Sequence, residues 1–296
     1  MLKLSVAVLT IALAAVSALG QSAPTLTVQE TNGPGLPADL FYGNTKVKPL
    51  RLRPGTNQVI TIDDADFFVS QHYIDFLNRF SDQGGQDYWT ARITQCGTDA
   101  TCIANRRIDV SAAFFIELEF QATGYYVYKF YLGSLNRKPS FAEFMPDRRQ
   151  VVAGTDLEAG KQSFALSWVQ RAEFLQKYPA SLDGPSFVDA LLATVLANSG
   201  VNLSSQRSTL INLYNSNGGG NNGRAAVLRS VVEDATFSQS QYNPAFVRMQ
   251  YFGYLRRDPD AGGESFWVNV LNNREPNNFR GMVNAFITSQ EYRDRF

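Results

Sequence analysis

The chain has 296 residues, of which 44% are hydrophobic and 12% aromatic, which is ample for a sizeable core. Lys plus Arg and Asp plus Glu number 27 each, so no large net charge attracts nucleic acid or an anionic membrane surface. We therefore expect a folded protein of one large or two ordinary domains that binds no nucleic acid.

The first twenty residues have the pattern of a secretory signal peptide. Lys3 precedes an apolar run from Leu4 to Val16, and small residues follow from Ser17 to Gly20. An uncleaved membrane anchor is the alternative, but the run is shorter than the roughly 20 residues that span a bilayer. We expect residues 1–20 to be removed. The mature chain, without a transmembrane segment, is then expected to be exported to the periplasm, the cell surface or the medium.

Residues 21–62 are rich in Pro, Gly and Thr and lack a sustained helical period. They are predicted to form an extended leader with one or two short strands, such as Val59 to Ile62.

From residue 63 onward the sequence predicts an all-α fold of four helical repeat units, each of about 60 residues. An aromatic-Val pair opens a periodic helix four times, at intervals of 58, 61 and 59 residues. These pairs are Phe68-Val69, Tyr126-Val127, Phe187-Val188 and Phe246-Val247. Each unit closes on a second periodic stretch that ends in an aromatic residue. The predicted units span residues 63–121, 122–180, 181–240 and 241–296, and Asn243-Pro244 is the helix-start signal of the last.

The first and last units share a set of residues that align without a gap. These repeat positions are Tyr73, Leu77, Arg79, Asp82, Gly84, Gly85 and Trp89 in the first unit and Tyr251, Leu255, Arg257, Asp260, Gly262, Gly263 and Trp267 in the last. The Asp and Gly residues predict an inter-helix turn, because Gly permits positive φ and Asp accepts hydrogen bonds from a helix start.

The repeated Trp and Arg residues each have a structural and a functional interpretation. An exposed Trp pair would stack on carbohydrate, but a Trp at a repeated helical position more often packs helix against helix. The arginines, with Arg137 at the equivalent place in the second unit, are expected to cap helix ends or pair with the loop Asp rather than bind phosphate.

Cys96 and Cys102 are the only cysteines, and in an exported protein they are predicted to form a disulfide that closes a small loop. A metal site is the alternative. It lacks ligands, because His72 is the only histidine and lies in a different predicted helix.

Two further motifs are weak indications of a ligand. Asp258 and Asp260 offer hard oxygen ligands for calcium, but the first unit has Phe80 in place of Asp258 and the full calcium-loop pattern is absent. Residues 215–223 contain a G-x-G-x-x-G match that, without alternating strands and helices, is better explained as a polar loop. We expect no cofactor, with calcium as the minor alternative.

Catalytic constellations are poor. One histidine and two paired cysteines leave no supported Ser-His-Asp or Cys-His arrangement. Glu117 and Glu119 are two residues apart on a predicted helix and so do not face one another.

Three sequence runs carry a family resemblance: F-V-x-x-x-Y-x-x-[FY]-L-x-R, D-x-G-G-x-x-[FY]-W and the closing A-F-[IF]-x-x-x-E-[FY]. They resemble the bacterial domain of unknown function 4214, which is similar in turn to the helical phycobilisome linker domains. The resemblance covers about residues 63–296 and is strong in the first and last units, whereas the middle two lack the Gly-Gly and Trp positions. It implies a helical, exported or surface-associated bacterial protein with no assigned catalytic residues.

Two functions from different classes remain. We expect a non-catalytic helical repeat protein of the bacterial envelope that presents a surface to an unknown macromolecule, either protein or glycan. The alternative is an extracellular carbohydrate-active enzyme, a glycosidase or lyase on an all-α scaffold. Two carboxyl groups about 5 to 10 Å apart in one concave pocket would favour the enzyme.

Overall fold

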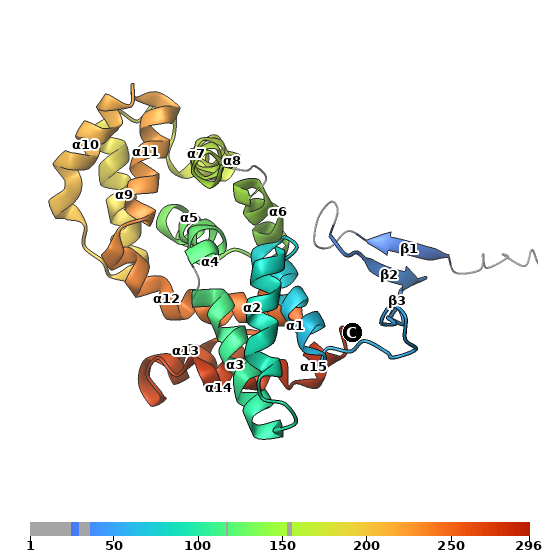
Figure 1. The fold of residues 1–296 in the computed structure, drawn as a ribbon. Helices are drawn as coiled ribbons and strands as arrows, with labels where there is room; N and C mark the ends of the chain where they lie inside the picture. The colour runs from blue at the N-terminus through green and yellow to red at the C-terminus, as the bar shows by residue number, and fades with distance from the viewer. Residues whose placement is uncertain (1–24, 30–35, 117, 153–155) are drawn as a thin grey trace, which may run out of the picture.

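The computed structural model describes residues 25–29, 36–116, 118–152 and 156–296 (Figure 1). The described part is mostly helical with one small sheet, so the predicted all-α class is confirmed. The predicted signal peptide, residues 1–20, lies outside the described residues. Every helix in the described ranges is too short or too polar to cross a bilayer. The number of repeats stays a prediction, and the four predicted ranges are called segments 1 to 4 below.

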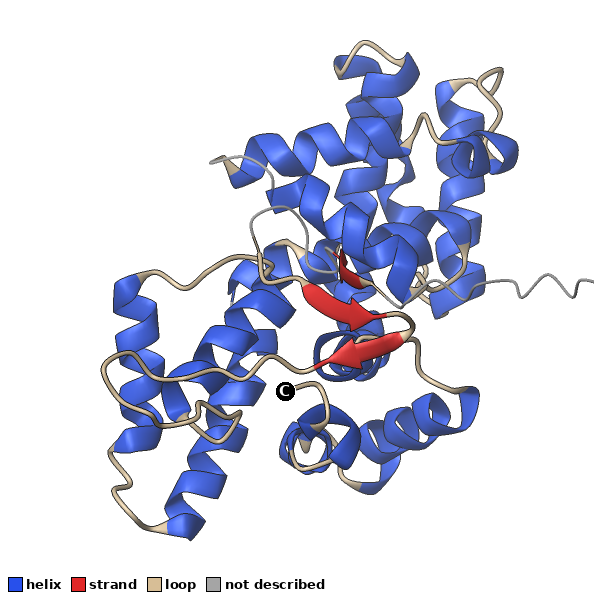
Figure 2. Ribbon diagram, turned by 90° about the vertical axis from the view of Figure 1, so that its right-hand side faces the viewer, coloured by secondary structure: helices blue, strands red, loops and turns tan. Residues whose placement is uncertain are grey.

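The leader forms a three-stranded antiparallel sheet with the order β1-β2-β3. Its strands are β1 (Leu26–Gln29), β2 (Asp39–Tyr42) and β3 (Thr45–Val47). The sheet stands away from the main helical body, to the right in Figure 1 and in front of the helices in Figure 2. The predicted strand from Val59 to Ile62 is wrong, because only Val59 makes a bridge there, with Leu52.

Segments 1 and 2 each contain an opening helix that ends in a π-helical turn, followed by further helices. Segment 1 holds α1 (Ala65–His72), η1 (Tyr73–Leu77), α2 (Gln83–Thr94), α3 (Ala100–Ile116) and α4 (Leu118–Ala122). Segment 2 holds α5 (Gly124–Phe130), η2 (Tyr131–Leu135), α6 (Phe141–Val152), α7 (Leu157–Trp168) and α8 (Ala172–Lys177). Each segment thus has more helices than the opening and closing stretches that its sequence predicts.

Segments 3 and 4 share one long helix. Segment 3 holds α9 (Gly184–Ser199), η3 (Ser204–Gln206), α10 (Arg207–Ser216) and α11 (Gly220–Val232). Then follow α12 (Ala235–Gln250), η4 (Tyr251–Leu255), α13 (Ala261–Asn269), η5 (Val270–Arg274), α14 (Phe279–Ile287) and α15 (Gln290–Arg293). The predicted start at Asn243-Pro244 is wrong, because α12 begins earlier, where the Asp234 side chain accepts a hydrogen bond from the Phe237 amide.

Three of the four opening helices end in the same local geometry. The five-residue π-turns η1, η2 and η4 are each followed by one left-handed residue, Asn78 (φ 57°), Asn136 (φ 57°) or Arg256 (φ 58°). Asn tolerates this region better than most residues, whereas Arg requires support from its surroundings. The third opening helix, α9, has no such turn and instead ends at Gly200 (φ 71°), an ordinary C-terminal cap.

The segments pack in two pairs through these turns. A Cβ atom on Gly253 in η4 would lie 2.5 Å from the Phe76 ring of η1, so segments 1 and 4 approach closely there. A Cβ atom on Gly133 in η2 would likewise lie 2.9 Å from the Val232 side chain of α11, so segments 2 and 3 approach closely there. The four opening aromatics are at most 1% exposed and belong to one hydrophobic core. The aromatic residues therefore hold the helices together, as predicted.

A buried charge cluster links the two pairs. Asp75 of η1 is 3% exposed and receives two hydrogen bonds of 2.9 Å from the Arg295 guanidinium. Arg148 of α6 donates to the backbone oxygens of Asp75 and Phe76, both at 2.9 Å. One carboxylate and two carbonyls thereby connect η1 to α6 and to the C-terminal end of the chain.

Candidate functional site

A Tyr-Arg-Glu frame recurs in segments 1, 2 and 4. The first residue of each π-turn is a Tyr, and the Arg that follows the left-handed residue lies over its ring, at 4.9, 5.0 and 5.3 Å from the ring centre. The same Arg binds a Glu of the last short helix of its segment through two parallel hydrogen bonds. The three frames are Tyr73-Arg79-Glu119, Tyr131-Arg137-Glu173 and Tyr251-Arg257-Glu291.

The frame corrects the predicted roles of the arginines. Their main partner is the Glu before the closing aromatic, whereas the loop Asp is within reach of Arg79 only, at 3.5 Å from Asp82. Glu117, the other carboxylate of that stretch, lies outside the described residues. The sequence held a usable signal, since a Glu precedes the closing aromatic in the three segments that have the Arg.

In segments 1 and 4 the predicted Asp-Gly-Gly turn packs beside the Tyr of the frame. Asp82 and Asp260 cap the next helix by accepting hydrogen bonds from the Gly85 and Gly263 amides, at 2.8 and 2.7 Å. None of the four repeated glycines has positive φ, so that predicted reason for them is wrong. The second glycine of each pair is required for space instead. A Cβ there would lie 2.1 Å from the Tyr73 hydroxyl or 2.3 Å from the Tyr251 hydroxyl.

The repeated Trp residues pack against the core at the edge of each frame. Trp89 lies 5.7 Å from Phe114 and Trp267 lies 6.3 Å from Phe286, between ring centres. Both are half-buried, which agrees with the packing role predicted for them. Of the two leucines, Leu77 is 5% exposed and Leu255 is partly buried against the same core.

Segment 2 has the same Tyr-Arg-Glu frame, but different residues stand at the Asp, Gly and Trp positions beside it. Counted from the frame Arg, Ser140 stands at the place of the capping Asp, Glu143 at the place of the second Gly, and Asp147 at the place of the Trp. The Glu143 carboxylate accepts hydrogen bonds from the amide and the hydroxyl of Ser140, at 2.8 and 2.9 Å, and so forms a capping box. The turn is thus preserved while a Gly and a Trp are exchanged for two carboxylates.

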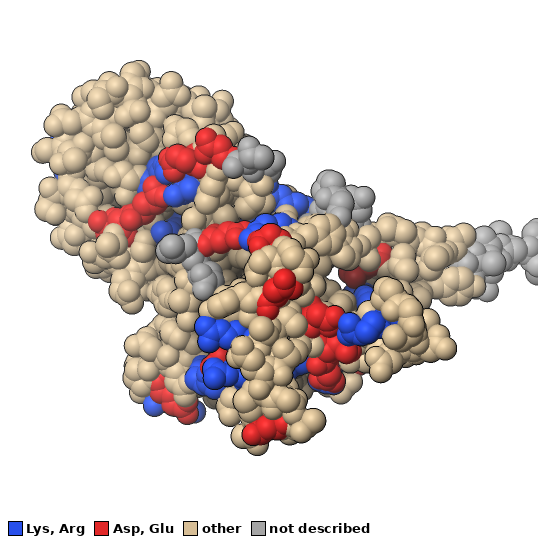
Figure 3. All heavy atoms as spheres, viewed as in Figure 1, with Lys and Arg blue, Asp and Glu red and all other residues tan. Residues whose placement is uncertain are grey.

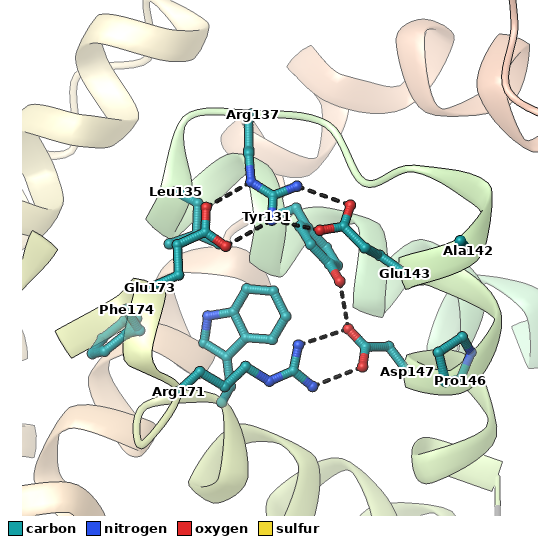
Figure 4. A pocket seen from close by; sticks show the side chains of 11 residues that line it. Tyr131, Leu135, Arg137, Ala142, Glu143, Pro146, Asp147, Arg171, Glu173 and Phe174 are labelled. Atoms are coloured by element: carbon teal, nitrogen blue, oxygen red, sulfur yellow. Dashed lines mark hydrogen bonds and ion pairs between the residues drawn. The ribbon is translucent and has the colours of Figure 1, made fainter. Parts of the chain in front are cut away.

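The result is a polar pocket of about 340 Å³ between η2, α6, α7 and α8 (Figure 4). Arg137 bridges two of its carboxylates, with hydrogen bonds of 2.7 Å to Glu173 and of 2.8 and 3.0 Å to Glu143. Below them Arg171 and the Tyr131 hydroxyl both donate to Asp147, at 2.7 and 2.6 Å. The sequence pattern indicates the frame Arg, whereas nothing in it predicts that these carboxylates form a group.

Arg137 favours the ionised form of the two carboxylates that it binds. Hydrogen bonds from Arg137 lower the pKa of Glu143 to about 2 and also lower the pKa of Glu173. Burial, followed by the hydrogen bond to Asp147, raises the pKa of Tyr131 above its ordinary value. At neutral pH Glu143 and Glu173 are therefore ionised and the Tyr131 phenol is protonated. This is a fixed pattern of donors and acceptors, whereas a general acid needs a carboxyl with a raised pKa.

The acidic residues of the calcium alternative are bound to other groups of the chain. The Asp260 carboxylate serves as a helix cap, and the Asp258 carboxylate accepts a hydrogen bond from the Phe141 amide at 2.9 Å. Glu264 is bound by Arg248 at 2.8 Å. Among the described residues, no group of three or more acidic, His or Cys side chains converges as a metal site would require.

The predicted cysteine pair is present. Cys96 and Cys102 lie at disulfide distance, with 1.97 Å between the sulfurs and 5.5 Å between the Cα atoms. Both ring nitrogens of His72 are hydrogen-bonded within the protein, to the Phe68 carbonyl at 2.7 Å and to the Ser111 hydroxyl at 2.5 Å, so neither is free to bind a metal. The Gly-rich stretch is a turn with Gly218 and Gly219 at positive φ, followed by α11.

Comparison with known proteins adds no relative. No family model matches the chain, and the searches of curated proteins and of solved structures return no match. The resemblance to the domain of unknown function 4214 therefore stays a sequence-based expectation.

Proposed function

We propose that the chain is an exported, non-catalytic helical repeat protein that acts as an interaction module of the bacterial envelope. It has four units, and the polar pocket of segment 2 is its contact point for a macromolecular partner. The observation that carries the proposal is the exchange within the recurring frame. Segments 1 and 4 close the space beside the frame Tyr with Gly and Trp, and segment 2 opens that space with Glu143 and Asp147.

The pocket is suited to recognition because its groups are already oriented. Each carboxylate is held by an Arg through two hydrogen bonds. Each Arg also lies over an aromatic ring that lines the pocket, as Arg171 does at 4.3 Å from Trp168. Ordered charged groups lose little side-chain freedom when a ligand binds. On the face seen in Figure 3, acidic and basic side chains lie beside each other in mixed groups. Such a mixed surface favours specific polar contacts over general attraction of anions.

The competing proposal, a glycosidase or lyase, rests on the three carboxylates that line one pocket. Two features speak against it. The pKa values of Glu143 and Glu173 are lowered, whereas glycoside hydrolysis needs one carboxyl that holds its proton near neutral pH. The Tyr131 phenol has a raised pKa, so it stays protonated at neutral pH and is not available as a general base. The geometry therefore supports binding better than reaction.

The proposal is tested by adding the purified, labelled protein to envelopes of a bacterium that lacks it. Glu143→Ala removes a pocket wall but leaves Arg137 paired with Glu173, so the fold is expected to persist. The matched control is Glu158→Ala, a 68%-exposed carboxylate on α7 outside the pocket. We expect the wild type and the control to bind and Glu143→Ala to bind at least tenfold less tightly. Equal binding by all three proteins would refute the pocket as the contact point.

The same assay identifies the class of partner. Protease treatment of the envelopes should abolish binding to a protein, and periodate oxidation should abolish binding to a glycan. Loss of binding after either treatment names the partner class, and binding that survives both treatments contradicts a protein or glycan partner.

A further inference from the structure

The small sheet has an apolar face that the rest of the described chain does not cover. The register places Leu26 opposite Tyr42 and Val28 opposite Leu40, so these side chains lie on one face. Leu26, Val28 and Tyr42 are 61%, 63% and 52% exposed. A sheet that is hydrophobic on one face normally buries that face against another element, so this exposed face is unusual.

The outer edge of β1 is free among the described residues, since β1 pairs only with β2. Its hydrogen-bonding direction follows from the Gly43 amide, which donates to the Thr25 carbonyl at 3.2 Å. Antiparallel strands bond through alternate residues, so Thr25 and Thr27 face β2. The amide and carbonyl groups of Leu26 and Val28 therefore point outward.

The two edges of the sheet differ in their protection. Proteins block unwanted strand pairing with Lys and Pro at an edge. On the β3 side the chain has Lys46, Lys48 and Pro49, whereas the sequence of β1 is Leu-Thr-Val-Gln without a charge. A second copy of the β3 edge would place lysines against each other, but a second copy of the β1 edge meets no like charge.

We infer that β1 pairs with β1 of a second copy of this chain, antiparallel and in register about Thr27. In that arrangement the backbone of Leu26 in each copy exchanges two hydrogen bonds with the backbone of Val28 in the other. The outward amide and carbonyl groups of both residues then all have partners. The sheets join as β3-β2-β1-β1-β2-β3, and the apolar faces become continuous. Self-pairing fits these observations best, because the free groups are symmetric about Thr27 and no charge opposes its own copy. The inference is independent of the pocket in segment 2.

A cysteine introduced at the symmetry axis tests the register. Thr27 of one copy would face Thr27 of the other as a non-hydrogen-bonded pair, about 4.5 Å apart between Cα atoms. We expect Thr27→Cys to form a covalent dimer on mild oxidation, within the range a disulfide spans. Gln29→Cys is the control, because its copies would be about 13 Å apart along the strands and should stay monomeric on a non-reducing gel. The native cysteines do not interfere, because they are paired with each other.

Light scattering coupled to gel filtration tests the dimer itself. The wild type should have twice the monomer mass. Val28→Pro removes an outward amide without touching the β1-β2 ladder and should be monomeric. The matched control is Lys46→Pro at the opposite edge, which should stay dimeric. A monomeric wild type at its highest soluble concentration, a dimeric Val28→Pro, or cross-linking of Gln29→Cys as fast as Thr27→Cys would each overturn the inference.

Discussion

Segments 1 and 2 share the Tyr-Arg-Glu frame but differ in the residues that pack beside its Tyr. Around Tyr73, a Gly and a Trp close the space beside the ring, so that nothing larger than a hydrogen atom fits on the second Gly. Around Tyr131, the equivalent places hold Glu143 and Asp147, and a pocket of about 340 Å³ results. The Arg-Glu pair and the π-turn are common to both segments. The comparison teaches that the residues at these equivalent places decide whether the space beside the frame Tyr is closed or open, although a separate pocket of about 250 Å³ is lined by Arg79 and Glu119.

The largest expected effect is the loss of the buried pair in the open frame. Asp147→Ala leaves Arg171 and the Tyr131 hydroxyl without their acceptor, and breaking a buried pair costs about 3 kcal/mol of unfolding free energy. Urea unfolding measures the change. Glu158→Ala, at an exposed ion pair on α7, should cost less than about 1 kcal/mol. Equal costs for the two variants would show that the Asp147 network contributes no special stability.

The only histidine predicts a pH dependence specific to segment 1. Burial lowers the pKa of His72 to about 4, while the unfolded chain titrates near 6.5. The unfolded state therefore binds more protons between these values, and stability falls by roughly 3 kcal/mol as the pH drops from about 6.5 to about 4. His72→Gln introduces the residue found at the equivalent Gln250.

Urea unfolding of the wild type and His72→Gln across that pH range isolates the effect, because the carboxylates titrate alike in both proteins. The difference between their unfolding free energies should change with pH between about 6.5 and about 4 and be constant at higher pH. A constant difference over the whole range would contradict the burial of a neutral His72.

The two glycines of the closed frame should respond in opposite directions. Gly85→Ala forces a methyl group against the Tyr73 hydroxyl and should cost about 1 to 3 kcal/mol, as overpacking does. Gly84→Ala meets only an ordinary contact of 3.6 Å and should be neutral or stabilise by up to about 1 kcal/mol. Thermal unfolding of both variants and of Gly85→Ala with Tyr73→Phe is the measurement. The double variant should recover stability, and a failure to recover would show that the hydroxyl is not the obstacle.

The smallest expected effect is the loss of one Glu partner of a frame Arg. It should differ between segment 1, where Arg79 has one Glu partner, and segment 2, where Arg137 has two. Glu119→Gln weakens the main acceptor of Arg79, whereas Glu173→Gln leaves Arg137 with Glu143. These pairs are a third to half exposed, so each loss should be under about 1 kcal/mol, and the loss at Glu119 should be the larger. Urea midpoints of the two variants decide the order. A larger loss at Glu173 would mean that Glu143 does not compensate.

Local sequence signals predicted the parts of the fold that depend on neighbouring residues. The opening aromatics, the capping Asp82 and Asp260 and the cysteine pair are all read from a few adjacent positions. The left-handed residues after the π-turns were not predictable as a set, because Asn78 adopts a conformation that Asn tolerates whereas Arg256 adopts it against its own preference. The Arg-Glu pairs join residues 34 to 40 positions apart, beyond any local pattern.

The pocket was missed for a related reason. The motif shared by the first and last segments is defined by a Gly pair and a Trp, and in sequence their replacement in segment 2 looks like a loss of the motif. Aligning segment 2 on Arg137 would have placed Glu143 and Asp147 at those positions. Only the structure shows that Arg171, from the loop before α8, completes the group.

The most direct test of the central claim is a turnover assay. Purified protein is incubated with polysaccharides from its own envelope, and new reducing ends and new carbon-carbon double bonds are measured over time. If the pocket is a binding site, neither the wild type nor Glu143→Gln should form product above the buffer control. Product that the wild type forms and that Glu143→Gln or Asp147→Asn does not form would contradict the account and identify the pocket as an active site.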